Sequence, residues 1–498
     1  MNAIDKARIK RKRALKETAE KTWEYVVIGS GITGAQTFRV LAAKGYKVLM
    51  IDAGDFSSGT SSSSGMLIWG GLLYLKHLDF KSVFKFSISR DRLIKQDKEN
   101  VKVLPVSYLT DKSKPHAGMA LWLYWLFSMF RRKRPSRQTR CTNDGMFLRK
   151  YKYQRVFEEA IIRQSDSRYV MDLILHSLTQ SRSSRAFNYL ELVSGKFNYD
   201  SWTLRLSDKI QGNALTLTAN NVINCAGIST DVVNQRLDVH DSPYRHLWSK
   251  GVYLNLVRDK AHQTMFIFDD PEKDDVMTFC PVGKVSFFGP TEDNIDKDRG
   301  AARELTHADI TQLKQKYEVC TGKKLNRHDV VSFRMGVRPL CVPKNASHDE
   351  HTLSISRNSN IHHVPSMNFA AVYGGKFTGS YMLAKRTAKL FGINNVPLEQ
   401  GVPASQQSGK ENSNQVDPQT AVLHEQCWTL KDYLRNRTFV NQSVPNGGFG
   451  INFEFKEKLE NLSMHFADEL ASLDVSLNAY LNEQVEIDEL FNEVFDVS

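Results

Sequence analysis

A glycine-rich turn near the N-terminus constrains the fold of this chain more than any other feature. The apolar segment Tyr25–Ile28 leads directly into Gly29-Ser30-Gly31-Ile32-Thr33-Gly34, and a helix is expected over Ala35–Lys44. A second apolar segment, Lys47–Ile51, ends at Asp52. Strand, glycine turn, helix and strand in this order predict one βαβ unit at the start of the folded region.

The spacing of the three glycines indicates a dinucleotide site. The first permits a tight turn, the second lets the backbone approach a pyrophosphate closely, and the third lets the helix pack closely against the strand. The pyrophosphate then lies at a helix N-terminus, whose free N–H groups and dipole favour negative charge. A carboxylate at Asp52 can accept both ribose hydroxyls of an adenosine and would repel the 2′-phosphate of NADP, so FAD and NAD both stay open. The expected contacts are Gly29, Ser30, Gly31, Thr33, Gly34, Asp52 and Ala53.

The composition is that of a large folded chain with a basic surface. Of the 498 residues, 41% are hydrophobic and 24% are charged, which is enough apolar material for two or three structural units. Much of the net charge of +12 lies in Lys6–Lys16 and Arg131–Arg140, which suits an anionic partner or simply a solvated surface. No nucleic-acid recognition module accompanies this charge, so no nucleic-acid partner is expected.

The cysteines and histidines give no sign of a disulfide framework or a metal site. Six scattered cysteines without a C-x-x-C pair suit a reducing cytoplasm. The polar run His348–His351 is interpreted as a turn between strands, and no metal is expected.

The sequence pattern predicts neither a secretory signal nor a membrane span. The basic N-terminus has no apolar run behind it, and residues 4–20 predict a short charged helix. The longest apolar stretch, Ala117–Phe130, is too short to cross a bilayer. Its aromatic residues and the following Arg131–Arg134 suit a helix at a membrane interface, or equally a buried helix with a basic end. A cytoplasmic location is expected, with peripheral contact to the inner face of the membrane as an open alternative.

The rest of the chain divides by pattern into sheet, linker and helical tail. Residues 398–418 are rich in Gln, Ser, Asn, Gly and Pro and predict a linker, beyond which a helical tail follows. Four strand-like segments predict an antiparallel sheet in a second layer: Trp202–Leu206, Leu215–Ala219, Gly251–Val257 and Val285–Gly289.

Further motifs give the chain a specific resemblance. They are Gly54–Ser64, Ile68–Leu75, Asn224–Gly227, Gly336–Leu340, Gly374–Thr378 and Thr429–Arg437. In this order, and over most of the chain, they closely resemble the FAD-dependent glycerol-3-phosphate dehydrogenases, which belong to the amino-acid-oxidase-like flavoproteins. The resemblance resolves the choice of cofactor in favour of FAD.

The resemblance also implies an α/β fold with three parts. These are a Rossmann-type FAD-binding domain, an antiparallel β substrate domain and a C-terminal helical unit. The expected boundaries are a basic helix over 1–21, the FAD domain over 22–240 together with 331–397, the substrate domain over 241–330, the linker over 398–418 and the helical unit over 419–498.

The motifs add contacts to the expected FAD site. Small hydroxylated residues can wrap a pyrophosphate, and Gly374-Gly375 leaves open the N-terminus of a helix expected over Ser380–Leu390, which in the family faces the pyrimidine edge of the flavin. Lys376 would there stabilise the reduced ring. The added residues are Thr60, Ser61, Ser62, Gly70, Gly71, Ala226, Gly227, Gly374, Gly375, Lys376, Phe377 and Thr378.

The expected substrate pocket departs from the family pattern. Four polar family residues (a Lys, two His and an Arg) are replaced here by Met66, Trp69, Tyr253 and Leu73. Two basic positions, Arg338 and Arg357, survive. The loss of one arginine contact removes roughly 1.5–3 kcal/mol of binding to an anion. A larger and more apolar substrate with one anionic group is therefore expected, and glycerol 3-phosphate itself is the alternative.

The expected reaction is hydride transfer to the flavin from a carbon that carries a hydroxyl or an amine. Arg338 would hold the substrate anion with Arg357 as a second contact, Tyr253 or a water would pass on the proton, and Trp69 and Leu73 would line the pocket. The electron acceptor is either quinone or oxygen. A catalytically inert FAD-binding scaffold is the alternative of another class, motivated by the lost polar groups.

Overall fold

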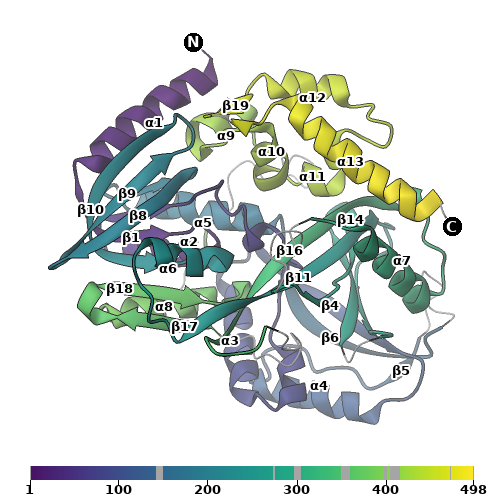
Figure 1. Cartoon of the computed structure of the whole chain (residues 1–498). Coiled ribbons are helices and arrows are strands. Elements are labelled where there is room, and N and C mark those ends of the chain that lie inside the picture. Colours follow the sequence, from purple (N-terminus) through teal and green to yellow (C-terminus); the bar gives the residue numbers. More distant parts are fainter. Residues whose placement is uncertain are drawn as a thin grey trace.

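The computed structural model describes residues 2–141, 150–272, 275–296, 304–348, 359–396, 401–403, 416–471 and 473–496. It contains two large sheets with helices around them and a C-terminal helical unit, as Figure 1 shows. The prediction of an α/β fold with a Rossmann-type domain, a mostly antiparallel second sheet and C-terminal helices is confirmed.

The first sheet contains the βαβ unit that the glycine turn predicts. Its central strands β18, β10, β1, β2 and β7 are parallel to one another, while β17, β9 and β8 are antiparallel additions. Helix α2 (Ile32–Ala43) connects β1 to β2 and packs against α5 (Asp166–Gln180) and α8 (Ser380–Leu390). The strands of this sheet are β1 (Thr22–Ile28), β2 (Val48–Ile51), β7 (Arg185–Phe187), β8 (Leu190–Asn198), β9 (Ser201–Asp208), β10 (Asn213–Asn224), β17 (Asn360–Val364) and β18 (Phe369–Tyr373).

Two of the four strand-like segments lie in a different sheet from the one expected. Trp202–Leu206 and Leu215–Ala219 belong to β9 and β10 of the first sheet, so their assignment to the second layer was wrong. Strand β10 is 12 residues long and pairs antiparallel with β9 through its first part and parallel with β1 through its last part. Alternation of apolar and polar residues predicts a strand but not its partner.

The second sheet is built on two long paired strands. Strands β11 (Tyr244–Val257) and β16 (Val330–Pro343) run antiparallel from Tyr244 opposite Pro343 to Leu256 opposite Val330. The sheet also takes in β4 and β6, so it extends beyond residues 241–330, and the division of the chain into domains stays a prediction. Its other strands are β3 (Leu67–Ile68), β4 (Val101–Thr110), β5 (Thr139–Arg140), β6 (Tyr153–Ile162), β12 (Met265–Asp269), β13 (Val276–Val282), β14 (Val285–Gly289) and β15 (Asp293–Asn294).

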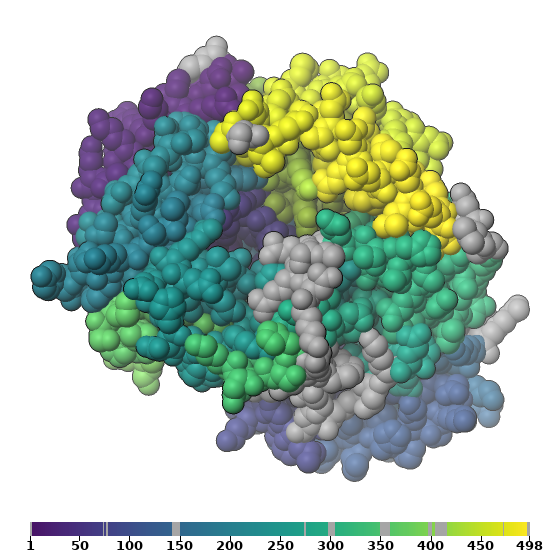
Figure 2. Space-filling view, in the orientation of Figure 1, coloured from purple at the N-terminus to yellow at the C-terminus, as the bar shows by residue number. Residues whose placement is uncertain are grey.

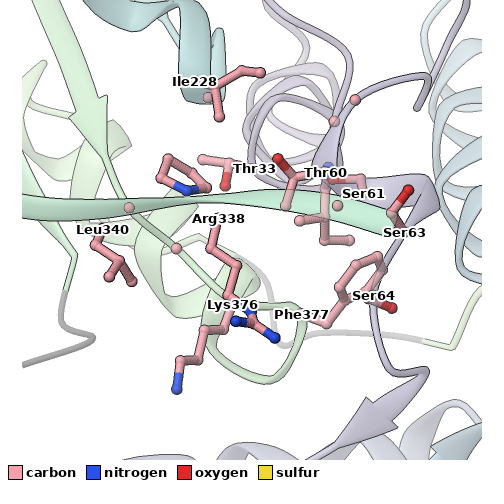
Figure 3. A pocket seen from close by; sticks show the side chains of 18 of the residues that line it. Thr33, Thr60, Ser61, Ser63, Ser64, Ile228, Arg338, Leu340, Lys376 and Phe377 are labelled. Carbon is pink, nitrogen blue, oxygen red and sulfur yellow. Dashed lines mark hydrogen bonds between the residues drawn. The ribbon is translucent and has the colours of Figure 1, made fainter. Parts of the chain in front are cut away.

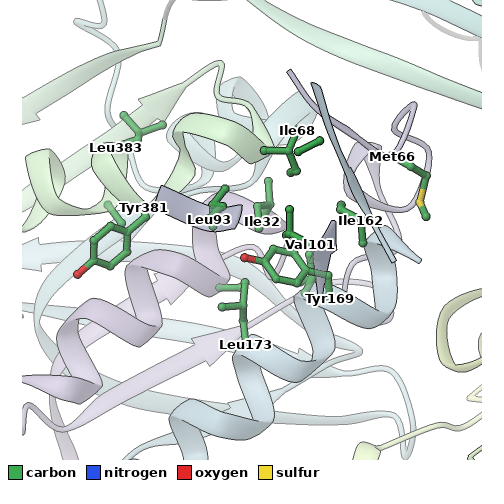
Figure 4. Packing of buried hydrophobic residues seen from close by; sticks show 14 of the residues in the cluster. Ile32, Met66, Ile68, Leu93, Val101, Ile162, Tyr169, Leu173, Tyr381 and Leu383 are labelled. Carbon is green, nitrogen blue, oxygen red and sulfur yellow. The ribbon is translucent and has the colours of Figure 1, made fainter. Parts of the chain in front are cut away.

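The largest core lies between these layers and joins α2, α5 and α8 to the second sheet. Figure 4 shows Ile32 of α2, Leu173 of α5 and Leu383 of α8 packed near Val101 and Ile162 of the sheet. Met66 belongs to this core and is fully buried. It therefore does not line the substrate pocket, where the comparison with the family motif had placed it.

Three helices lie beside the second sheet, and a fourth, α6 (Thr230–Arg236), packs mainly against the first sheet. Helix α4 includes most of the apolar stretch Ala117–Phe130, and no helix in the described ranges is long and apolar enough to cross a membrane. Asp79 caps α3 by accepting a hydrogen bond from the Ser82 N–H. The helices are α3 (Phe80–Gln96), α4 (Pro115–Phe127), α6 (Thr230–Arg236) and α7 (His307–Thr321), with 3₁₀ turns η1 (Thr60–Ser62), η2 (Leu72–His77), η3 (Gly227–Ser229), η5 (Arg327–Asp329), η6 (Pro365–Met367) and η7 (Phe377–Gly379).

The C-terminal unit has a core of its own, to which the N-terminal helix contributes. Ile4 and Ala7 of α1 (Ala3–Ala19) are buried with Trp428 and Phe449 of the C-terminal unit. In Figure 2 this unit, in yellow, lies against the purple N-terminal helix. Most of the expected linker, residues 398–400 and 404–415, is outside the described ranges. The unit consists of α9 (Pro418–Glu425), α10 (Leu430–Asp432), the π turn η9 (Tyr433–Arg437), α11 (Val440–Ser443), the 3₁₀ turn η10 (Asn446–Gly448), α12 (Lys456–Ser463), β19 (Glu469–Leu470), β20 (Leu473–Asp474) and α13 (Leu477–Asp496).

Candidate active site

A cavity of about 1310 Å³ connects the glycine turn of the first sheet to the long strands of the second. It is lined by the β1–α2 turn, by the loop of residues 53–65 (here called the Ser/Thr loop), by β8 and α6, by β11 and β16, and by the turn before α8. Figure 3 shows Thr60, Ser61 and Ser63 of the Ser/Thr loop facing the same space as Arg338 and Lys376. Single small ligands occupy roughly 300–1,000 Å³, so this cavity has room for a dinucleotide and a substrate together.

The glycine turn leaves no room for side chains at its first and third glycines. Gly29 has φ +99°, and a Cβ added there would lie 2.5 Å from the carbonyl oxygen of Cys225. A Cβ on Gly34 would lie 1.8 Å from the carbonyl oxygen of Gly29, so Gly34 allows helix α2 to pack closely on the turn. These contacts are the ones that the dinucleotide fingerprint requires.

The N-terminus of α2 faces the cavity without a blocking side chain. Its cap residue is Gly31, which has no side chain. The Ile32 N–H donates to Ser61 Oγ at 2.9 Å, so this hydroxyl acts as an acceptor and its own proton stays available to a ligand. Backbone N–H groups and a serine hydroxyl at a helix N-terminus form an anion site, which fits the diphosphate of FAD.

Asp52 lies at the end of β2 and lines the cavity, but it is already hydrogen-bonded. Its Oδ2 accepts from the N–H and the hydroxyl of Ser30, both at 2.7 Å, and its Oδ1 accepts from the Gly54 N–H at 2.9 Å. Burial raises the pKa of the Asp52 carboxyl. Ser30 thus orients the acid and does not itself line the cavity.

The structure brings most of the expected site residues together around this one cavity. Those that line it are Gly29, Gly31, Thr33, Asp52, Ala53, Thr60, Ser61, Trp69, Ala226, Gly227, Tyr253, Arg338, Gly374, Gly375, Lys376, Phe377 and Thr378. Those that do not line it are Ser30, Gly34, Ser62, Gly70 and Gly71. Arg357 lies outside the described residues, and of Leu73 only the backbone, in η2, is described.

Gly70 makes room for a buried ionic cluster and does not contact the cavity. A Cβ on Gly70 would lie 2.0 Å from the Tyr124 hydroxyl and 2.6 Å from Nη1 of Arg90. Arg90 Nη1 donates to the Tyr124 hydroxyl at 2.7 Å and to Glu159 Oε2 at 3.1 Å, and the Tyr124 hydroxyl donates to Glu159 Oε1. This cluster fixes α4 to the second sheet, so Gly70 acts through packing.

The end of the cavity around Arg338, where the substrate is expected (here called the substrate end), contains an ion pair that the sequence did not predict. Nη1 of Arg338 lies 3.2 Å from Oε2 of Glu292, whose side chain is only 5% exposed. Ser249 Oγ donates to the other oxygen of this carboxylate at 3.3 Å. Arg338 and Ser249 are opposite one another on β16 and β11, and Glu292 immediately precedes β15, which pairs with β11. No motif marks Glu292, because its role depends on strand pairing.

Three further expected residues surround this end. Lys376 Nζ donates to the Tyr74 hydroxyl at 2.6 Å and lies 4.6 Å from the centre of the Tyr74 ring. Tyr253 lies opposite Gly65, where an added Cβ would be 2.6 Å from the tyrosine hydroxyl. The Trp69 side chain lines the cavity, whereas its indole nitrogen is buried and has no hydrogen-bond partner among the described residues.

Sequence reasoning also missed an ion pair at the dinucleotide end. Arg236 Nη1 donates to Glu191 Oε1 at 2.6 Å and to the Leu192 carbonyl at the same distance, and all three residues line the cavity. Although burial opposes it, hydrogen bonds from Lys209 and Arg236 hold the pKa of Glu191 below its ordinary value. Within the described ranges no group of three or more metal-ligating side chains occurs.

A protein-family model and several proteins of known function are similar to this chain. A family model described as FAD dependent oxidoreductase (DAO) matches residues 24–121. The aerobic glycerol-3-phosphate dehydrogenase of Escherichia coli (strain K12) is 25% identical over 393 residues, which cover 77% of this chain and 75% of that protein. The glycerol-3-phosphate dehydrogenase of Mycobacterium leprae (strain TN) is 27% identical over 374 residues, which cover 73% of this chain but only 62% of that protein.

A solved structure shares the fold over nearly the whole chain. The glycerol-3-phosphate dehydrogenase from Bacillus halodurans, complexed with FAD, superposes with a TM-score of 0.60 at 17% identity and covers 98% of this chain and 94% of that chain. The predictions of FAD as cofactor and of an FAD-dependent enzyme are confirmed. The glycine turn and the N-terminus of α2 lie inside the segment that the DAO family model matches, and the chain is an FAD-dependent oxidoreductase that is distantly similar to the glycerol-3-phosphate dehydrogenases.

Proposed function

We propose that this enzyme oxidises a hydroxyl- or amine-bearing carbon of a small substrate with one negative charge, and that glycerol 3-phosphate is not its preferred substrate. The observation that carries this proposal is the ion pair between Arg338 and the buried Glu292. A carboxylate inside the substrate end already balances the cation that would hold the substrate anion.

The charges around the cavity support a weakly anionic substrate. A phosphate dianion in a partly dry pocket requires several charge-assisted donors. The described cations of the lining are Arg236, Arg338 and Lys376, and the first two are paired with carboxylates. Further acids line the cavity, namely Asp79, Glu272 and Asp275. A carboxylate group therefore suits this site better than a phosphate.

The side chains at the substrate end have separable roles in this proposal. FAD, when bound, accepts the hydride. Arg338 holds the substrate anion, and Arg357, as a second anion contact, stays a prediction. Tyr253 or a water relays to solvent the proton that leaves the substrate heteroatom, and the Trp69 ring lines the substrate pocket. Lys376 is held by the Tyr74 hydroxyl and stabilises negative charge on the reduced ring.

Anaerobic bleaching of the protein-bound flavin tests this function. The panel pairs glycerol 3-phosphate with hydroxy acids and amino acids of increasing size, each at equal concentration. Rapid bleaching by a carboxylate substrate and slow bleaching by glycerol 3-phosphate is the expected result. Rapid bleaching by glycerol 3-phosphate would instead establish the genuine glycerol-3-phosphate dehydrogenase, and a yellow protein that no compound bleaches would favour the inert scaffold.

Quinone is the acceptor that the surface next to the cavity favours over oxygen. Helices α3 and α4 pack together, with the rings of Phe80 and Phe127 5.0 Å apart, and they lie at the lower edge of Figure 1. Large exposed apolar side chains gather on this part of the chain: Leu78, Phe84, Met119, Trp122, Met129 and Phe130. Lys133, directly beyond α4, is 87% exposed. An apolar surface with a basic margin suits peripheral contact with an anionic inner membrane face.

Co-sedimentation with vesicles tests this contact. Trp125 is unsuitable for substitution, because its indole N–H donates to the Arg132 carbonyl at 2.8 Å and so holds the basic segment. Trp122→Ser is the better variant, with Val193→Ser on β8 as the control, since both side chains are similarly exposed, at 44% and 43%. Loss of binding to anionic vesicles in the first variant alone is expected. Equal binding of both variants and the native protein would leave oxygen as the favoured acceptor.

A further inference from the structure

The Ser/Thr loop is held in place by the C-terminal helical unit. Asp55 at the start of the loop and Ser63 near its end both receive hydrogen bonds from the π turn η9. The loop supplies a large part of the cavity lining, from Ala53 to Gly65. Its conformation at the dinucleotide site therefore depends on residues far away in the sequence.

Asp55 is a buried carboxylate whose two oxygens are saturated by donors from outside the loop. Arg437 donates from Nη1 to Oδ2 and from Nη2 to Oδ1, both at 2.8 Å. Asn436 Nδ2 donates to Oδ2 at 2.8 Å, and Asn188 Nδ2 donates to Oδ1 at 2.7 Å. Both ionic side chains are almost completely buried, with 0% and 1% exposure. A bidentate pair of this kind fixes both distance and orientation.

Arg435 controls the direction of a hydroxyl that lines the cavity. Its Nη2 donates to Ser63 Oγ at 3.0 Å, so Ser63 serves as acceptor and its own proton is left for a ligand in the cavity. Ser61 is oriented in the same sense by the Ile32 N–H. Two hydroxyls of the loop thus present their protons to the dinucleotide site.

Arg435 is a buried cation without a direct ion-pair partner among the described residues, although Asp166 and Glu483 lie near enough to attract it. Among the described residues no carboxylate lies within ion-pair distance of Arg435, and its Nε has no hydrogen-bond partner. The neighbouring cation Arg334 is itself paired with Asp166. A shielded cation without a direct ion pair is costly, and an anion bound nearby lowers this cost. The diphosphate of FAD is an anion of the right kind for the adjoining cavity.

We propose that the C-terminal unit retains the cofactor: Arg437 acting through Asp55, and Arg435 acting through Ser63, hold the Ser/Thr loop in its FAD-binding conformation. Both arginines are positioning residues, because neither lines the cavity. This inference rests on FAD as the cofactor of the cavity. The π turn places Arg435, Asn436 and Arg437 in succession toward the loop, and π turns within helices are frequent at functional sites.

Titration of the apoprotein with FAD tests the proposal without any enzymatic turnover. The dissociation constant is measured from the change in flavin fluorescence for the native chain, Arg435→Met and Arg435→Lys. We expect about a tenfold or larger rise in the dissociation constant for Arg435→Met, equivalent to about 1.4 kcal/mol, and partial recovery for Arg435→Lys. The matched control is Arg327→Met, since Arg327 also joins the C-terminal unit to the body of the protein, through Asp488, but does not contact the loop.

A double-mutant cycle separates positioning from general stability. Ser63→Ala removes the hydroxyl and leaves the arginine, so it should weaken FAD binding even if Arg435→Met folds poorly. The combined variant should bind no more weakly than the weaker single variant, because the two residues act as one unit. Unchanged FAD affinity in Ser63→Ala and Arg435→Met, or an equal loss in Arg327→Met, would overturn the proposal. Failure of the native apoprotein to bind FAD would instead contradict the cofactor, and absence of bleaching with intact FAD binding would contradict only the proposed reaction.

Discussion

Replacing Glu292 by Gln is expected to make the cavity bind phosphate monoesters more tightly. Oε2 of Glu292 lies 3.2 Å from Nη1 of Arg338, and the two side chains are 5% and 25% exposed. Gln keeps the size of the side chain and an acceptor for the Ser249 hydroxyl, but it removes the negative charge. Arg338 then presents its full positive charge to the substrate end.

The magnitude follows from the negative charge of Glu292, which in the variant no longer competes with the ligand for Arg338. We take as its scale the about 1.5–3 kcal/mol that a hydrogen bond to a charged group contributes. Each 1.4 kcal/mol changes a dissociation constant by a factor of about ten. The affinity for glycerol 3-phosphate should therefore rise about 10- to 150-fold, and partial exposure of Arg338 places the result toward the lower limit, because solvent screens the charge.

The assay is an anaerobic titration that follows the perturbation of the flavin absorbance by glycerol 3-phosphate and by inorganic phosphate. The matched control is Glu272→Gln. Glu272 also lines the cavity, but its Oε2 lies 3.2 Å from Nζ of Lys316 and not beside Arg338. Equal affinity in the native protein and Glu292→Gln, or the same gain in the control, would refute the argument that Glu292 sets the charge preference of the site.

Three further substitutions test other parts of the structure. Gly34→Ala should abolish FAD retention, because the new methyl group would lie 1.8 Å from a backbone oxygen. Gly45→Ala, outside the cavity and with nothing within 4 Å, should cost stability through its φ of +84° but retain the yellow colour on purification. Gly70→Ala should lower the free energy of unfolding, measured with denaturant, by about 1–3 kcal/mol through overpacking. The double variant with Tyr124→Phe should lose less stability than the two single variants added together, because Tyr124→Phe removes the hydroxyl oxygen that would lie 2.0 Å from the new methyl group. Burial, and then the negative charge of Asp55, raise the pKa of Asp432 from 3.8 to about 7. In the folded protein Asp432 therefore keeps a proton that it releases in the unfolded chain. The protonated Asp432 contributes its full stability below the unfolded pKa, and this contribution is lost as the pH rises toward 7. The melting temperature of the native protein should therefore fall from about pH 4 to 7 by an amount that Asp432→Asn does not show. The same pH profile in both proteins would contradict the assignment.

The dinucleotide end of the site was predictable because its signal is local. The glycine turn, α2 and Asp52 belong to one βαβ unit, and each of them has a fixed place in that unit. Of the expected cofactor contacts, only Ser30, Gly34, Ser62, Gly70 and Gly71 do not line the cavity. Ser30 and Gly34 still support the site, because Ser30 orients Asp52 and Gly34 lets α2 pack closely on the glycine turn.

The substrate end was only partly predictable. The change from a polar residue at Trp69 is visible in the sequence, and the side chain does line the cavity. Met66 shows the opposite outcome, because the same motif places it in the fully buried core. The pleat of the chain decides which residue of a motif faces the cavity, and motif spacing alone does not reveal it.

The sequence by itself determined the βαβ unit, the FAD family and the residue types around the cofactor, since these depend on short segments whose backbone geometry is local. Only the tertiary structure decided that β9 and β10 join the first sheet, that Glu292 faces Arg338, and that η9 holds the Ser/Thr loop. Asp55 and Arg437 are separated by 382 residues in the sequence. No sequence pattern links a carboxylate to a distant arginine that pairs with it. Whether the two side chains come into contact depends on how the strands pair and how the C-terminal unit docks, and both are decided by the packing of the whole chain.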